Sequence, residues 1–217
     1  MNNIKQRNIL LGITSIICIS LLIGRLYISS STCYIFLIWN LFLAWIPLYF
    51  SQKLSDVPSE RKNWKILVLF LSWLVFFPNA PYIITDLFHL VPKRNVPLWY
   101  DLVLIMSFAW NGLLLGFVSL MEIHQALLKM FSVKSTWAII GSILLLSGYG
   151  IYLGRFERWN SWDIITHPFR LVRHIFLNFQ DPEALPRIIG VTFSFGVFLM
   201  ISYATIYFLS NKHEATK

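Results

Sequence analysis

The sequence predicts an all-α fold: an integral membrane helical bundle of about six transmembrane helices plus one interfacial amphipathic helix. Of the 217 residues, 57% are hydrophobic and only 13% are charged, whereas soluble domains have roughly 45–50% and about 25%. Apolar stretches near the length that crosses a bilayer, about 20 residues, recur along the chain. Six of them use on the order of 120 residues, so we expect residues 1–217 to form a single membrane domain.

The first two predicted spans, residues 9–28 and 34–50, form a helical hairpin around the polar turn 29–32. Lys5 and Arg7 precede the first span as they would in a signal peptide. No small-residue cleavage pattern follows, so we expect the span to be retained. Cys18 and Cys33 lie at different expected depths, which disfavours a disulfide between them.

The third predicted span, residues 66–77, ends at a proline pair. Pro78 and Pro81 lack backbone N–H donors and disfavour helical geometry at the residues that precede them. The apolar run resumes over residues 82–90. We therefore expect a helix with a break at 78–81, near its exit from the membrane.

The remaining predicted spans are residues 98–122, 136–153 and 188–209. In the first of them, Gly112 and Gly116 next to Asn111 indicate close helix packing with an asparagine hydrogen bond. At its end, Glu122 and His124 are interpreted as a solvated helix terminus.

An amphipathic helix is predicted over residues 168–179, inside the long polar stretch 154–187. Pro168 is a favourable first helical residue. Apolar side chains recur every three or four positions, at Phe169, Val172, Phe176 and Phe179. Polar side chains lie elsewhere on the helical wheel, at Arg170, Arg173, His174 and Asn178. This pattern is typical of a helix in the membrane interface, and packing against the bundle is the alternative.

The net charge is +8. Membrane proteins accumulate basic residues in their cytoplasmic loops and where they contact anionic lipid headgroups, so we expect no nucleic-acid partner. Placing the N-terminus inside assigns ten of the 18 Lys and Arg residues to the cytoplasm and eight to the outside. Five of those eight lie in residues 155–187. We therefore expect both termini in the cytoplasm.

In this orientation, polar ends of the third, fourth and fifth spans face one side and supply one candidate site. Ionisable groups near hydrocarbon are costly and are normally paired or functional. The catalytic candidates are Asp86, His89, Asp101, Glu157 and Asp163, and the ligand-binding candidates are Asn79, Tyr82, Arg155, Arg158, Trp159 and Asn160.

Asp86 and His89 are three residues apart, a spacing that suits an acid/base pair or two metal ligands on one helix face. Helix capping and a hydrogen-bonded surface histidine form the alternative. With Asp101 these residues could ligate a divalent ion, but this is the minority interpretation. We predict no metal, and the sequence identifies no cofactor.

Arg155 and Arg158 are also three apart, and aromatic residues flank them. A guanidinium matches phosphate because its planar fork donates two hydrogen bonds at once. The expected ligand is an anionic lipid or a phosphate-bearing envelope intermediate. In the alternative, both arginines pair with nearby carboxylates and the tryptophans form an interfacial belt.

Three segments carry a family resemblance: residues 77–87 (FPNAPYIITDL), 99–101 (WYD) and 148–163 (GYGIYLGRFERWNSWD). In these segments the chain resembles a bacterial family of multi-pass membrane proteins, domain of unknown function thirteen sixty-one. The resemblance implies a helical protein of the bacterial plasma membrane. It implies no activity, substrate or cofactor.

The leading functional hypothesis is an extracytoplasmic polar site that binds or processes a phosphorylated or anionic headgroup. If the protein is an enzyme, His89 or a carboxylate would act as base and the arginines would hold the anion. One alternative is a small transporter or channel-like protein, because broken helices mark transporter sites. The other is a non-enzymatic membrane scaffold. The sequence does not determine the oligomeric state, and a homo-oligomer is possible.

Overall fold

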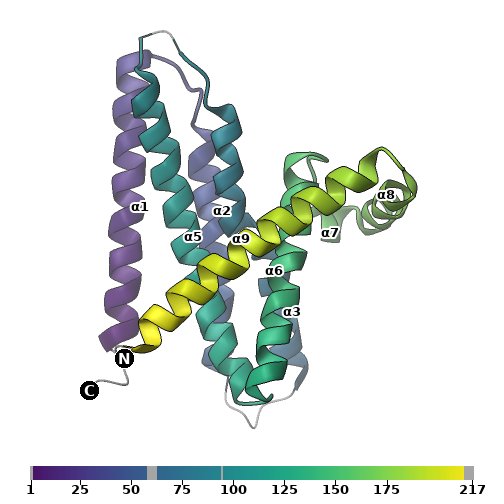
Figure 1. Ribbon diagram of the computed structural model, residues 1–217. Helices are drawn as coiled ribbons and strands as arrows, with labels where there is room; N and C mark the ends of the chain where they lie inside the picture. Colours follow the sequence, from purple (N-terminus) through teal and green to yellow (C-terminus); the bar gives the residue numbers. More distant parts are fainter. Residues whose placement is uncertain (1, 58–62, 94, 213–217) are drawn as a thin grey trace. The chain divides into compact units, whose positions relative to one another are not determined.

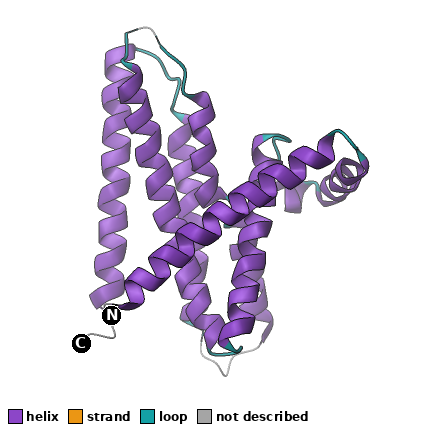
Figure 2. Ribbon diagram, viewed as in Figure 1, coloured by secondary structure: helices purple, strands orange, loops and turns teal. Residues whose placement is uncertain are grey.

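The computed structural model describes residues 2–57, 63–93 and 95–212, and over them the chain is helical without a β-strand (Figure 2). It divides into two compact units, Met1–Ser119 and Leu120–Lys217. Helix α5 (Leu98–Leu128) contributes residues to both. Arg61, Lys62 and Lys217, which entered the orientation prediction, lie outside the described residues.

Within the described residues, five helical segments are long and apolar enough to cross a membrane. They are Ile4–Ser29, Trp64–His89, Leu98–Leu128, Val133–Arg155 and Ala184–Ser210. They coincide with five of the six predicted spans and, by their length and apolar composition, indicate a membrane protein. Helix α2 (Phe36–Ser55) covers most of the remaining prediction, residues 34–50, but does not belong to this set. The sixth span therefore stays a prediction.

The first unit contains α1 (Asn2–Ser29), α2, α3 (Asn63–Phe76), α4 (Asn79–Tyr82), the 3₁₀ helix η1 (Ile83–His89) and most of α5 (Figure 1). Its apolar core joins α1, α2, α4, η1 and α5 through fully buried side chains such as Leu22, Leu37, Ile83 and Leu104. Close approach is possible because Gly112 and Gly116 of α5 both lie against Ala80. The predicted tight packing of these glycines is confirmed.

The proline pair changes the hydrogen-bond pattern without ending the helical path. Helix α3 stops at Phe76, and α4 begins three residues later, at Asn79. Pro78 keeps right-handed helical angles, φ −60° and ψ −22°. Ala80 lies inside α4, so the expectation that the residue before Pro81 leaves helical geometry is wrong. The backbone tightens instead into the 3₁₀ turns of η1.

The second unit contains the end of α5, α6 (Val133–Arg155), α7 (Asp163–Thr166), α8 (Pro168–Gln180) and α9 (Ala184–Lys212). Helices α6 and α9 are in close contact, because a Cβ added at Gly148 would meet the backbone of Thr192 and Gly196. The helix predicted over residues 168–179 is present as α8, with Pro168 in its first turn.

Candidate functional site

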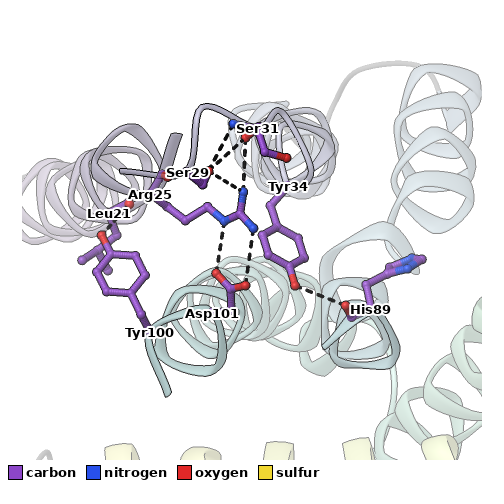
Figure 3. A network of polar contacts seen from close by, with 8 residues as sticks. All are labelled: Leu21, Arg25, Ser29, Ser31, Tyr34, His89, Tyr100 and Asp101. Atoms are coloured by element: carbon purple, nitrogen blue, oxygen red, sulfur yellow. Dashed lines mark hydrogen bonds and ion pairs between the residues drawn. The ribbon is translucent and has the colours of Figure 1, made fainter. Parts of the chain in front are cut away.

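A buried ion pair joins α1 to α5 in the first unit (Figure 3). Arg25 donates from Nε to Oδ1 of Asp101 at 3.1 Å and from Nη2 to Oδ2 at 3.5 Å. Its Nη1 donates to Oγ of Ser29 at 3.0 Å and to the carbonyl oxygen of Ser31 at 3.2 Å. Both charged side chains are 1% exposed. All three guanidinium nitrogens are thus engaged, and the carboxylate of Asp101 is committed to the pair.

Tyr34 completes this network, because its ring lies under the guanidinium of Arg25 at 4.7 Å. Its hydroxyl donates to the carbonyl oxygen of His89 at 3.2 Å (Figure 3). The phenol is thus the hydrogen-bond donor in this contact. The network ties η1 to the turn between α1 and α2.

Asp86 and His89 have different surroundings, although both belong to η1. Asp86 is 1% exposed and accepts a hydrogen bond from Nδ2 of Asn40 at 2.8 Å. His89 is exposed, and its ring meets that of Phe36 edge-on at 5.2 Å. Among the ligand-binding candidates, Asn79 donates to the carbonyl oxygen of Phe76 at 2.9 Å and so satisfies the end of α3.

The second unit contains a polar cluster around Glu157, just after α6. The carboxylate accepts a hydrogen bond from the hydroxyl of Tyr152 at 2.7 Å and lies 2.8 Å from Nε2 of His174 on α8. Asn178, one turn later on α8, is a further hydrogen-bond partner of the same carboxylate. Burial alone would raise the pKa of Glu157, but these hydrogen bonds and the charge of His174 outweigh it and lower the pKa. Glu157 is therefore an anion that fastens α8 to α6.

Arg158 and Trp159 follow Glu157 at a tight chain reversal. Arg158 has φ 58°, in the left-handed region, and the N–H of Trp159 donates back to the carbonyl oxygen of Leu153 at 3.1 Å. This is a common way to terminate a helix, and glycine is the usual residue at the left-handed position. The indole of Trp159 lies 5.5 Å from the ring of His174 and 5.8 Å from the guanidinium of Arg170. Arg158 itself is exposed.

Asn160 and Asp163 form a local turn at the start of α7. Oδ2 of Asp163 accepts a hydrogen bond from the backbone N–H of Asn160 at 2.8 Å. That bond is the main cause of the lowered pKa of Asp163. His167 lies 3.6 Å from the other oxygen of the carboxylate. Asp163 therefore shapes the loop that precedes α8.

The eleven candidates are divided between the two units. Asn79, Tyr82, Asp86, His89 and Asp101 belong to the first unit, and Arg155, Glu157, Arg158, Trp159, Asn160 and Asp163 belong to the second. Among residues 2–57, 63–93 and 95–212, no group of three or more His, Cys, Asp or Glu side chains has the arrangement of a metal site. The functional roles of the eleven candidate residues stay predictions.

Sequence reasoning did not select several residues that these networks contain, among them Arg25 and His174, and it misplaced His124. Arg25 could have been found, because an arginine inside an apolar run needs a buried partner. His174 is 17 positions from Glu157, and no local spacing links them. His124 is fully buried, with Nδ1 at 2.8 Å from the hydroxyl of Tyr203 and its ring stacked on Tyr207. Its interpretation as part of a solvated helix end is wrong, because α5 continues to Leu128.

A model of the family described as "Protein of unknown function (DUF1361)" matches residues 39–202. No curated protein and no solved structure gives a significant match to the chain. The matched range includes Asp86, Asp101, Glu157 and α8, whereas α1 and Arg25 precede it.

Proposed function

The chain belongs to this family of proteins of unknown function, and from its own residues we propose that it binds a phosphate-bearing, anionic lipid headgroup at a bacterial plasma membrane. The proposed site consists of α8 and residues 155–160, at the end of α6. Its ligand would be a membrane lipid or an envelope intermediate with an exposed phosphate.

The observation that carries this proposal is the exposed apolar side of α8. Phe169 is 90% exposed, Val172 65% and Phe176 62%. The helix has 13 residues and is about 20 Å long, too short to cross the roughly 30 Å hydrocarbon core. A short helix with an apolar side open to its surroundings, in a chain with five candidate spans, fits a position along the membrane interface.

Charge complementarity favours an anionic ligand. Arg170 and Arg173 on α8 and Arg158 in the preceding loop are all exposed. Guanidinium groups bind phosphate through paired hydrogen bonds, and tryptophans such as Trp159 are enriched at headgroup level. The arginines would therefore meet lipid phosphates where the phenylalanines enter the acyl region.

The topology that we propose has six spans, with α2 as the second, and both termini in the cytoplasm. The 20 residues of α2 match the length that a span requires. The Lys and Arg distribution favours this orientation, which would put residues 155–187 on the outer face of the membrane. The ligand would then be a headgroup of the outer leaflet.

A binding assay on Arg158→Gly tests the proposal. Glycine suits the left-handed backbone at this position while the variant loses the guanidinium. For full-length protein in neutral detergent, we expect wild type to prefer phosphatidylglycerol over phosphatidylcholine in mixed micelles. Arg158→Gly and Arg170→Gln should each weaken binding about tenfold, since hydrogen bonds to charged groups contribute roughly 1.5–3 kcal/mol.

The control for charge is Arg158→Lys, which keeps the positive charge but loses the paired donors, so its phosphatidylglycerol binding should lie between those of wild type and Arg158→Gly. Thermal unfolding of each variant verifies that it is folded. Equal binding of the two lipids by wild type, or full binding by folded Arg158→Gly and Arg170→Gln, would contradict the proposal.

A small transporter is the second candidate function, and one observation favours it. The candidate span Trp64–His89 changes from α-helix to 3₁₀ helix near Pro78 and contains the buried carboxylate of Asp86. Interrupted helices and buried ionisable groups mark substrate pathways in transporters. Solute flux into proteoliposomes that is lost in Asp86→Asn would support this function.

A further inference from the structure

The cluster around Glu157 fixes the protonation pattern of His174. An ionised carboxylate only accepts hydrogen bonds, so the 2.8 Å contact with His174 requires the proton to be on Nε2. Nδ2 of Asn178 also lies 3.1 Å from this nitrogen, and because an amide nitrogen only donates, it hydrogen-bonds to the carboxylate and not to the protonated Nε2. In the neutral ring, the lone pair is therefore on Nδ1. A carboxylate orients the base of hydrolytic triads in this way.

Nδ1 of His174 has no hydrogen-bond partner in the part of the chain that the structure describes, and the side chain is 34% exposed. Arg170 precedes His174 by four residues on α8, so the two lie on the same side of the helix. The indole of Trp159 contacts both of them. A phosphate on Arg170 would thus be held one helical turn from an accessible imidazole nitrogen.

We propose that His174 is the general base for hydrolysis of a terminal phosphate monoester on a membrane lipid whose phosphate binds Arg170. This inference rests on the proposed headgroup site and adds a reaction to it. His174 would be the catalytic residue, and Arg170 would bind the substrate. Glu157 is a positioning residue, because it acts through His174.

In the reaction, Nδ1 removes a proton from a water molecule while the water oxygen forms a bond to phosphorus. The bond between phosphorus and the lipid oxygen breaks, and the imidazolium returns its proton to that oxygen. The products are the lipid alcohol and inorganic phosphate. Atoms and charges balance with water as the other reactant. Arginine stabilises the charge that develops on the phosphate oxygens.

The rate should depend on pH, and the groups around His174 define this dependence. Glu157 contacts His174 directly. The charged and titratable groups next to this pair are Tyr149 and Tyr152 from α6, which interact with Glu157, Arg170 from α8, which shares the indole of Trp159 with His174, and Arg187 of α9, which interacts with Tyr152. A general base works only when it is deprotonated. The rate should therefore fall in acid, because a protonated base cannot accept the proton of water.

The experiment measures inorganic phosphate released from phosphatidic acid in mixed micelles by full-length protein. We expect His174→Ala to lower kcat by about 100-fold or more, the usual contribution of a general base. Glu157→Gln should lower kcat with little change in KM and should shift the pH profile. Arg170→Gln should raise KM and also lower kcat, because the arginine binds the phosphate and stabilises the charge that develops on it. The control is His167→Ala, an exposed histidine outside the cluster, which should keep full activity.

Two further arms separate this inference from the proposed function. Binding of phosphatidic acid is measured in parallel, and soluble glycerol 3-phosphate is offered as substrate. Binding without phosphate release would overturn the hydrolysis and leave the headgroup site standing, whereas absence of binding would overturn both. Release that survives in folded His174→Ala, or that is as fast from glycerol 3-phosphate, would also contradict the inference.

Discussion

Arg25 and Asp101 are charged residues at almost fully buried positions, and each is tolerated because of the other. Removing two ions from water carries a penalty of several kcal/mol per ion, which their attraction offsets only with good geometry and further hydrogen bonds. The geometry is good because Arg25 contacts Asp101 through two nitrogens and lies over the ring of Tyr34. The further hydrogen bonds are those from Arg25 to Ser29 and Ser31. The pair therefore anchors α1 on α5, and neither group can be lost alone.

We expect Asp101→Asn to lower the free energy of unfolding by about 3–5 kcal/mol, the range for breaking a buried ion pair. Arg25→Gln should have a similar effect, and the double variant should lose less than the sum of the two. Denaturant titration of the purified protein in detergent measures all three. The exposed residue Asp56 is the control, and Asp56→Asn should change the stability by less than about 0.5 kcal/mol. Additive losses would show that the pair is uncoupled.

Glu157 predicts a specific acid sensitivity. Because the pKa of Glu157 is lowered in the folded protein, its contribution to stability is complete above the ordinary glutamate value, about 4.3. That contribution is lost as the pH falls through the lower, folded-state value. The unfolding temperature of wild type, measured between pH 3 and 7, should therefore fall at acid pH. This fall should be absent from Glu157→Gln. Identical pH dependence of the two proteins would count against the cluster.

The sequence predicted parts of the site to different degrees. Glu157, Arg158 and Trp159 stand out because they are charged or aromatic residues that directly follow an apolar span. Their partner His174 is brought near only by the path through α7 and α8. A polar residue next to a span can be recognised from local composition. Its partner is set by tertiary packing, which periodicity does not contain.

The helices are held together by small residues at close crossings, together with apolar burial. Gly112 and Gly116 leave room for Ala80, and Asn111 donates to Oγ of Ser15 at 2.8 Å. Most elements could be predicted, because a span and an amphipathic helix each have a characteristic hydrophobic period. The backbone conformation at Pro78 could not be predicted from the sequence. Proline is compatible with both α and 3₁₀ geometry when the preceding turn supports it, so its presence alone does not decide between them.

Gly112→Ala tests the packing of α5 against α4. An added Cβ would lie 2.7 Å from the carbonyl oxygen of Ala80 and 2.8 Å from Cδ1 of Ile83. We expect a loss of about 1–3 kcal/mol in the free energy of unfolding, as is typical of overpacking. At Gly12 of α1 a Cβ meets nothing within 4 Å, so Gly12→Ala should be neutral or stabilising by up to about 1 kcal/mol. Equal effects of the two variants would mean that the close approach is absent.

At the scale of the whole molecule, five candidate spans in the described residues indicate a membrane protein. The sequence predicted this class directly, because length and apolar composition alone determine whether a helix can cross a bilayer. Orientation depends on a small excess of Lys and Arg on one side. The side on which residues 155–187 lie decides whether their ligand comes from the outer leaflet or from the cytoplasm.

Labelling of intact cells tests the orientation. In a Cys18→Ser, Cys33→Ser background, Asn160→Cys places one thiol at an exposed position. We expect a membrane-impermeant thiol reagent to label it in intact cells as well as in lysed ones, because the loop should lie outside. Labelling only after lysis would reverse the topology and direct the search towards cytoplasmic phosphates.

The position of α8 at the membrane surface is the central claim, and spin labels test it most directly. In the same cysteine-free background, single cysteines at Phe176 and Arg170, which lie on different sides of α8, are labelled and the protein is placed in anionic vesicles. The account predicts that a label at 176 collides with lipid-soluble oxygen and is protected from a water-soluble nickel complex, while a label at 170 shows the opposite. Equal access of the nickel complex to both labels would contradict it.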